Sequence, residues 1–291
     1  MFKGSFVALI TPFANGGIDE EAFGRFVDWQ IREGSNGVVP CGTTGESPTL
    51  SHPEHKRVID LCVAAAGGRV PVIAGTGSNS TEEAISLTRH AKEAGADAAL
   101  VVTPYYNKPT QEGLYRHFKA INDAVDLPIL IYNIPGRCVV DMSVETMARL
   151  AELANVVGVK DASNDSVRPL HTRRACGEDF CQLSGEDASV LALLAGGGDG
   201  CISVTANVAP RLCAAMHAAW NGGDPAGALA IQNRLMPLHD ALFVETSPAP
   251  VKYAAGLLGF GDGRLRLPLV EPVAATKSRV EDAMRSAGLL N

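Results

Sequence analysis

The sequence predicts a (β/α)8 barrel with a C-terminal helical extension. Eight short apolar segments alternate with helical segments along the first two thirds of the 291-residue chain. Most of the apolar segments are continuous hydrophobic runs, which is typical of strands that are covered on both faces in a parallel sheet. A doubly wound open sheet is the alternative, but it has fewer strands and one nucleotide-binding fingerprint, so we favour the barrel.

The predicted strands come at regular intervals and most end at a polar residue or a turn. They are Val7–Thr11, Gly37–Pro40, Val70–Gly75, Ala98–Thr103, Ile129–Asn133, Val156–Lys160, Gln182–Gly185 and Gly200–Val204. Between strands, Asp19 is positioned to cap a helix that runs to Gly34. The four-residue patterns beginning at Ser51 and Ser80 each end in a glutamate and match a helix-capping box.

The chain continues well beyond the last predicted strand. One helix at 209–221 completes the barrel, and further helices are predicted at 225–236, 251–258 and 273–287. We therefore expect a catalytic barrel at residues 1–222 and a helical region at 223–291 that packs on it.

Charge and composition exclude several classes of partner. The chain has 25 Lys and Arg against 32 Asp and Glu, with no long basic run, which argues against nucleic acid and anionic membranes. It has no apolar run long enough to cross a bilayer, and its N-terminal apolar stretch is too short for a signal peptide. Seven scattered cysteines without a Cys-x-x-Cys pair indicate buried free thiols and a cytoplasmic protein.

In a barrel of this type, the active site lies at the carboxyl ends of the strands. The residues at those ends include hydroxyls and one lysine but no histidine cluster, so we expect no metal. Lys160 follows a buried strand, and a desolvated lysine can form a Schiff base with a ketone. Its alternative role is a strand-end lysine that reaches solvent or pairs with Asp161. Tyr132 ends the neighbouring strand and is either a proton shuttle or a core tyrosine with a satisfied hydroxyl.

Three other segments carry weaker signals. The Gly42–Ser47 turn offers backbone N–H groups and the hydroxyls of Thr43 and Thr44 to a carboxylate or phosphate, but it lacks the lysine of a P-loop. The Gly75–Ser80 segment lacks the third glycine of a dinucleotide loop. Arg137 follows a strand end and could clamp a carboxylate, or could be an ordinary surface arginine.

Two histidines at a helix start are spaced for a metal pair. His52 and His55 are three residues apart, but the sequence offers no third ligand, so we favour an exposed polar face. Glu83 is accounted for by its capping box.

Five motifs together resemble the dihydrodipicolinate synthase family of the pyruvate-dependent class I aldolase (N-acetylneuraminate lyase) superfamily. They are GTTGES at 42–47, VTPYYNKP at 102–109, YNIPGR at 132–137, GVKDAS at 158–163 and CISVTAN at 201–207. The resemblance runs from Phe2 to the C-terminus. It implies a lyase that condenses pyruvate with L-aspartate-4-semialdehyde in the diaminopimelate route to lysine.

The resemblance also implies roles for individual residues. Lys160 would form an imine with pyruvate, which needs neither a metal nor a diffusible cofactor. The Thr43–Thr44 turn would hold the pyruvate carboxylate, and Arg137 would hold that of the aldehyde substrate. Tyr132, Thr43 and Tyr106 would form a proton relay, with Tyr106 reaching into the neighbouring subunit of a homotetramer that is a dimer of dimers. Gly185 and the backbone of Ile202 would line the pyruvate pocket.

Two alternatives remain. Related aldolases that act on N-acetylneuraminate or a keto-deoxy sugar acid share the lysine and the tyrosine, but they lack this arginine in the YNIPGR context. A non-catalytic barrel that binds amino acids is disfavoured because Lys160, Tyr132 and Tyr106 are all intact.

The same resemblance implies feedback inhibition by L-lysine. Family members with this property bind lysine at a dimer interface, where this chain would supply Ser47, Pro48, His52, His55, Asn79, Glu83 and Tyr105. Glu83 would pair with the ammonium group of the effector. The chain departs from the family pattern at Pro48, at Cys138 beside Arg137, and at Asp161, where glutamate is common.

Overall fold

The computed structural model describes residues 2–291 and divides into two compact units. The first, here called the middle unit, consists of residues 2–3 and Val72–Ile202. The second, the terminal unit, combines Gly4–Pro71 with Ser203–Asn291.

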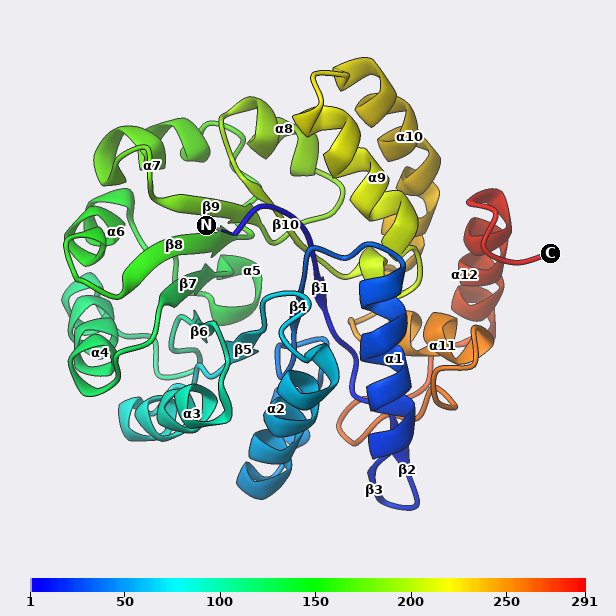
Figure 1. Cartoon of the computed structure of the whole chain (residues 1–291), viewed down its shortest axis with the longest axis horizontal. Coiled ribbons are helices and arrows are strands. Elements are labelled where there is room, and N and C mark those ends of the chain that lie inside the picture. The colour runs from blue at the N-terminus through cyan, green and yellow to red at the C-terminus, as the bar shows by residue number, and fades with distance from the viewer. Residues whose placement is uncertain (1) are drawn as a thin grey trace. The chain divides into compact units, whose positions relative to one another are not determined.

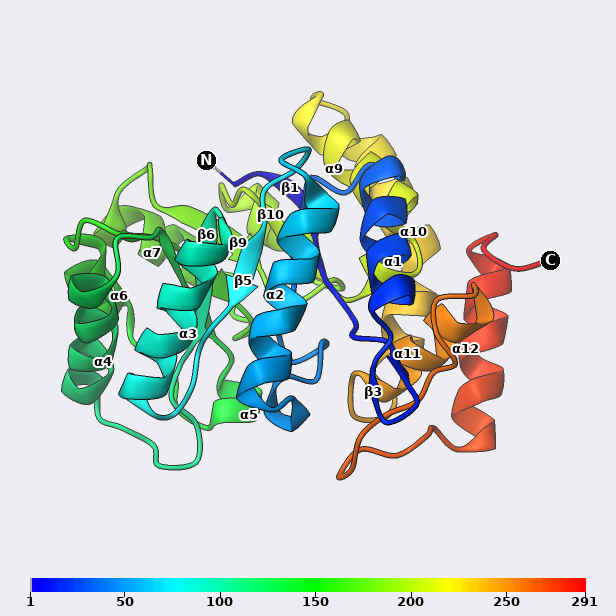
Figure 2. The ribbon, with the colours of Figure 1, turned by 60° about the horizontal axis from the view of Figure 1, so that its bottom comes forward.

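The middle unit is a parallel sheet whose strand order follows the chain. Its strands are β5 (Ile73–Gly75), β6 (Ala98–Val102), β7 (Ile129–Asn133), β8 (Val156–Asp161), β9 (Cys181–Ser184) and β10 (Gly200–Ser203), whose last residue falls in the terminal unit. The helices are α3 (Thr81–Ala94), α4 (Gln111–Ala124), α5 (Pro135–Cys138), α6 (Val144–Ala151), α7 (Arg168–Cys176) and α8 (Val190–Ala195). Figures 1 and 2 show α3, α4, α6 and α7 along one side of these strands.

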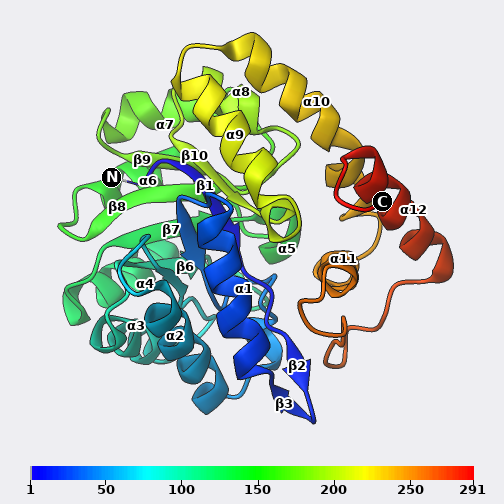
Figure 3. The same cartoon turned by 45° about the vertical axis from the view of Figure 1, so that its right-hand side comes forward.

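The terminal unit joins the beginning and the end of the chain. Its strands are β1 (Gly4–Ala8) and β4 (Gly37–Val39), which pair in parallel, and the short hairpin of β2 (Phe13–Ala14) and β3 (Gly17–Ile18). Its helices are α1 (Glu20–Arg32), α2 (His52–Ala66), α9 (Pro210–Asn221), α10 (Pro225–Ala241), α11 (Ala249–Leu257) and α12 (Ala274–Ser286), with 3-10 turns at Ser47–Thr49 and Thr205–Asn207. Helix α12 packs against α10 and α11, which are labelled in Figure 3.

The predicted fold class is confirmed. Over residues 2–291, eight parallel strands each precede a helix in chain order, which is the pattern of a (β/α)8 barrel, and further helices follow. All eight predicted strands overlap an observed one. The first lies earlier than predicted because the segment after Ala8 bonds to loops: Ile10 N–H donates to Asn207 Oδ1 and the Thr11 hydroxyl donates to Gly45 O. The division into residues 1–222 and 223–291 stays a prediction.

The predicted helix boundaries meet different outcomes. Asp19 caps α1 and Ser51 forms the full capping box of α2, as predicted. The predicted box at Ser80 is wrong, because the Glu83 carboxylate instead accepts a hydrogen bond from the Ser78 hydroxyl. The Ser78 oxygen in turn accepts from Ser80 N–H, so Ser78 bonds to both the Glu83 carboxylate and the Ser80 N–H group.

Two further elements depart from the sequence-based prediction. Helix α10 continues through Pro237 to Ala241, because the burial of Leu238 and Ala241 offsets the roughly 3 kcal/mol that an interior proline costs. The β2–β3 hairpin was not predicted. Its turn residues, Asn15 and Gly16, both have positive φ, and Asn-Gly is the strongest short signal for such a turn.

The cysteines agree with the expectation of buried free thiols. All seven cysteines are free, and six of them are buried. Within residues 2–291, no helix has the length and hydropathy needed to cross a bilayer.

A buried ion pair joins the two sequence segments of the terminal unit. Lys252 Nζ lies 2.5 Å from Glu46 Oε1, with the two side chains 2% and 0% exposed. Glu46 also accepts a hydrogen bond from Arg266 N–H, and Lys252 and Arg266 both lie over the ring of Phe13. Burial lowers the pKa of Lys252, whereas the charge of Glu46 acts in the opposite direction. Because Glu46 follows Gly45, this network fixes the end of the GTTG turn.

Candidate functional site

The register between β7 and β8 brings the two main candidate residues to one face. Ile129 pairs with Val156 but Leu130 pairs with Gly158, so Val157 is an extra residue in β8. This bulge makes Lys160 the partner of Tyr132. A one-residue shift would turn the lysine to the other face of the sheet.

Gly158 holds the chain in place just after the bulge. A Cβ added there would lie 2.3 Å from Cys181 O and 2.9 Å from Leu130 Cδ2. Only glycine fits between the neighbouring strands at this point, so the path of β8 toward Lys160 is fixed on both sides.

Lys160 is buried at the end of β8, with 5% of its surface exposed. Its Nζ lies 4.1 Å from the centroid of the Tyr132 ring, and Tyr132 is itself buried. The alternative in which Lys160 pairs with Asp161 or reaches solvent is not what the structure shows, because Asp161 is ion-paired with Arg168. A buried primary amine beside a phenol is suited to attack a carbonyl carbon and form a Schiff base.

Gly185 leaves room beside the lysine stem. A Cβ at this position would lie 2.8 Å from Ala162 Cβ and 3.1 Å from Lys160 Cε. Gly185 N–H donates to Asp161 O, which holds the backbone after β9 against the end of β8. Ile202, the other predicted pocket-lining residue of this unit, is fully buried in β10.

Glu186 was missed by the sequence analysis. Burial and the neighbouring Asp187 raise the pKa of its carboxyl, whereas the positive charges of Lys160 and Arg137 act to lower it. The carboxyl is therefore within electrostatic reach of both cations. Its position directly after Gly185, at a strand end, was the available signal.

Arg137 lies in the short helix α5 and is exposed to solvent. The next residue but one, Val139, ends that helix with φ of 64°. A positive φ is a genuine outlier for a β-branched residue, and such strain persists only where the surroundings hold it. The backbone beside Arg137 is therefore constrained although its side chain is accessible.

Three predicted effector-site residues lie together in the middle unit. Asn79 Nδ2 donates to Tyr105 O at 3.4 Å. Burial is the main cause that raises the pKa of the Tyr105 phenol, and the negative charge of Glu83 raises it further. Tyr106, next in the chain, has φ of 64° and is 90% exposed. Its phenol therefore points away from the unit that carries it.

The other predicted residues belong to the terminal unit. Thr43 is half-buried and Thr44 buried in the turn before Gly45, and Ser47 and Pro48 begin the following 3-10 turn. His52 is exposed, but the expectation of an exposed face is wrong for His55, which is 5% exposed. Position 55 faces inward because it lies on the same side of α2 as the buried Val58 and Ile59.

Known proteins are similar to this chain over its full length. The sequence model of the dihydrodipicolinate synthetase family matches residues 1–287. The chain is 72% identical, over 100% of both sequences, to the 4-hydroxy-tetrahydrodipicolinate synthase of Rhodospirillum centenum.

Two solved structures are also similar. A chloride-inhibited dihydrodipicolinate synthase from Acinetobacter baumannii, solved in complex with pyruvate, is 46% identical with a TM-score of 0.97 over 100% of both chains. The dihydrodipicolinate synthase of Cyanidioschyzon merolae, solved with lysine bound, is 40% identical with a TM-score of 0.96 over 99% of each chain.

The contact at Gly185 generates a test. Gly185→Ala should displace the Lys160 stem and slow the reaction of its amine with a small keto acid, measured by borohydride trapping, by about ten-fold or more, since misplacement by about 1 Å can cost 100-fold. Gly24→Ala is the matched control, because a Cβ there meets nothing within 4 Å. Trapping of Gly185→Ala at the wild-type rate would show that the glycine is not needed.

Proposed function

Because the chain belongs to the dihydrodipicolinate synthetase family, we propose that it condenses pyruvate with L-aspartate-4-semialdehyde to give 4-hydroxy-tetrahydrodipicolinate. The reaction is of the lyase type and belongs to the diaminopimelate route to lysine. The observation that carries the proposal is the buried Lys160 amine against the Tyr132 ring, at paired positions of β7 and β8.

The chemistry follows from a buried amine. Lys160 Nζ attacks the ketone carbon of pyruvate, and loss of water gives an imine. Loss of a methyl proton then gives an enamine, because the imine nitrogen accepts the electron pair. The enamine carbon attacks the aldehyde carbon of the second substrate. The amino group of that substrate finally attacks the imine carbon, which closes the ring and expels Lys160 as a free amine.

Other residues receive roles in this proposal. Tyr132 and Thr43 move protons between the nitrogen, the oxygens and solvent, and the Thr43–Thr44 turn receives the pyruvate carboxylate. Gly185 and Ile202 line the pyruvate pocket. Arg137 binds the carboxylate of L-aspartate-4-semialdehyde, for which its accessible guanidinium is suited.

The proposal extends to assembly and location. The 90% exposed phenol of Tyr106 supports a role in the site of a neighbouring subunit, within a homotetramer that is a dimer of dimers. Seven free thiols support a cytoplasmic location. The reaction needs no external cofactor, because the Lys160 imine accepts the electron pair. We keep residues 1–222 as the catalytic barrel and 223–291 as an associated helical region.

L-lysine is proposed as a feedback inhibitor. Asn79 and Glu83 each interact with Tyr105, and the three would supply an acidic group and hydrogen-bond partners to an amino acid. The terminal unit would supply the remaining residues, Ser47, Pro48, His52 and His55. The lysine-bound relative supports this choice of effector.

The first prediction concerns the covalent step. Incubation with pyruvate followed by borohydride should give one adduct, which peptide mass spectrometry maps to Lys160. Lys160→Ala should form no adduct there and should lose about 1,000-fold or more of the condensation rate. A wild-type protein that forms no adduct at Lys160 would overturn the proposed function.

The second prediction separates this activity from that of sugar-acid aldolases. Arg137→Ala should raise the KM for L-aspartate-4-semialdehyde about 10- to 100-fold, since a hydrogen bond between charged groups contributes about 1.5–3 kcal/mol. The variant should still form the pyruvate adduct. Wild-type turnover of N-acetylneuraminate or a keto-deoxy sugar acid, with none of L-aspartate-4-semialdehyde, would favour the aldolase alternative.

The third prediction concerns regulation. Millimolar L-lysine should inhibit the wild-type enzyme, and Glu83→Gln should raise the half-inhibitory concentration about ten-fold or more, because it removes the charge that pairs with the ammonium group. Each variant is compared with its own uninhibited rate. Full activity of the wild-type enzyme in millimolar lysine would contradict the regulatory proposal.

A further inference from the structure

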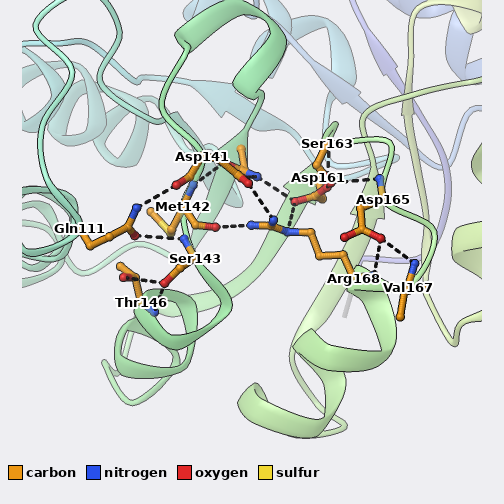
Figure 4. Close-up of polar contacts among 11 residues, drawn as sticks. Gln111, Asp141, Met142, Ser143, Thr146, Asp161, Ser163, Asp165, Val167 and Arg168 are labelled. Carbon is orange, nitrogen blue, oxygen red and sulfur yellow. Dashed lines mark hydrogen bonds and ion pairs between the residues drawn. The ribbon is translucent and has the colours of Figure 1, made fainter.

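We propose that Arg168 is a positioning residue that fixes the loop carrying Arg137 and so sets the affinity for the second substrate. This inference rests on the proposed function and extends it to a side chain behind the reacting groups. The observation that carries it is a polar network in which Arg168, Asn133 and Asp161 are largely buried and Asp141 is half-exposed. Figure 4 labels its three charged members.

The network occupies the opposite face of the sheet from the reacting groups. Asn133 and Asp161 directly follow Tyr132 and Lys160, and they are themselves paired in the register of β7 and β8. Because successive side chains of a strand point to opposite faces, Tyr132 and Lys160 share one face and the next pair shares the other.

Asn133 links both carboxylates. It is fully buried, and its Nδ2 donates to Asp141 Oδ1 at 2.8 Å and to Asp161 Oδ2 at 3.0 Å. Its Oδ1 accepts from Met142 N–H at 3.0 Å. The amide therefore ties the end of β7 to the end of β8 and to the segment that follows Arg137.

Arg168 supplies the positive charge between those carboxylates. Its guanidinium pairs with Asp141 Oδ2 through Nη1 and with Asp161 Oδ2 through Nε, each at 3.1 Å, and Nη2 donates to Met142 O. Figure 4 shows the guanidinium lying between the segment at Asp141 and Met142 and the end of β8 at Asp161. Because the side chains of Arg168 and Asp161 are only 10% and 15% exposed, removing Arg168 would leave the Asp161 carboxylate without its cation in a largely buried place, near the half-exposed carboxylate of Asp141.

Helix stability does not account for this arginine. Arg168 is the first residue of α7, whose first turn has no acidic residue and whose N–H groups at Val167 and Arg168 already donate to Asp165 Oδ1. A positive charge at this end opposes the helix dipole, which is unfavourable by a few tenths of a kcal/mol to 1 kcal/mol. The contacts to Asp141, Asp161 and Met142 are thus the interactions that favour an arginine at this position.

The consequence concerns segment 134–142, which carries Arg137. Its beginning continues from β7 at Asn133, and its end is held by both Asn133 and Arg168 at Asp141 and Met142. With both ends fixed, the segment can hold Val139 at φ of 64°. Loss of Arg168 would remove two of the contacts at the far end and leave those from Asn133 and Gln111. Arg137 would therefore sample more positions and bind a carboxylate less well.

The test measures the two substrates separately in the full-length enzyme. Arg168→Met should raise the KM for L-aspartate-4-semialdehyde about ten-fold or more, while the KM for pyruvate and the borohydride-trapped Lys160 adduct change less than about three-fold. The KM of Arg168→Lys for L-aspartate-4-semialdehyde should lie between those of wild type and Arg168→Met, because lysine keeps the positive charge but not the planar guanidinium. Arg116→Met is the control, since Arg116 makes an ion pair while its side chain is 77% exposed.

The outcomes distinguish positioning from general destabilisation. An equal rise in the KM for both substrates, or no change in either KM, would overturn the inference. If Arg168→Met does not fold, the same selective rise in Arg168→Lys decides the question. A wild-type enzyme that does not turn over L-aspartate-4-semialdehyde would instead overturn the proposed function, whereas an active wild type without the selective rise overturns only the role of Arg168.

Discussion

The pairing of β7 with β8 is the constraint on which the arrangement of candidate residues depends. The extra residue at Val157 shifts the register so that Lys160 and Tyr132 are partners on one face. Gly158 then fits between two neighbouring strands where no other residue could. Room for the lysine stem depends on the same strand end, because Gly185 packs against Ala162 and Lys160 Cε. One local irregularity thus determines which side chain meets the phenol.

The two faces of the β7–β8 pair carry different kinds of side chain. One face presents the Lys160 amine and the Tyr132 phenol, which exchange protons in the proposed reaction. The other presents Asn133 and Asp161, which make hydrogen bonds and an ion pair with Asp141 and Arg168. Since neighbouring residues of a strand move together, a rigid rear face limits motion of the reactive one. In the proposed reaction, residues on the rear face therefore help to preorganise the site.

Sequence reasoning was most successful where a signal lies within one element. Continuous apolar runs located all eight strands, and the position of Lys160 after such a run led directly to a strand end. The capping box at Ser80 was wrong because Ser78, only two residues upstream, competes for the same partners. The bulge at Val157 and the contacts of Arg168 could not be predicted, because they depend on pairing between segments that are distant in sequence.

The ion pair between Glu46 and Lys252 has a consequence for protein synthesis. Its members are 206 residues apart, so at about 5–20 residues per second the ribosome adds the lysine roughly 10 to 40 seconds after the glutamate. Until then, the GTTG turn ends in a carboxylate that has no cation to accompany it into the interior. The first segment of the terminal unit therefore cannot form this buried pair until the last part of the chain has been made.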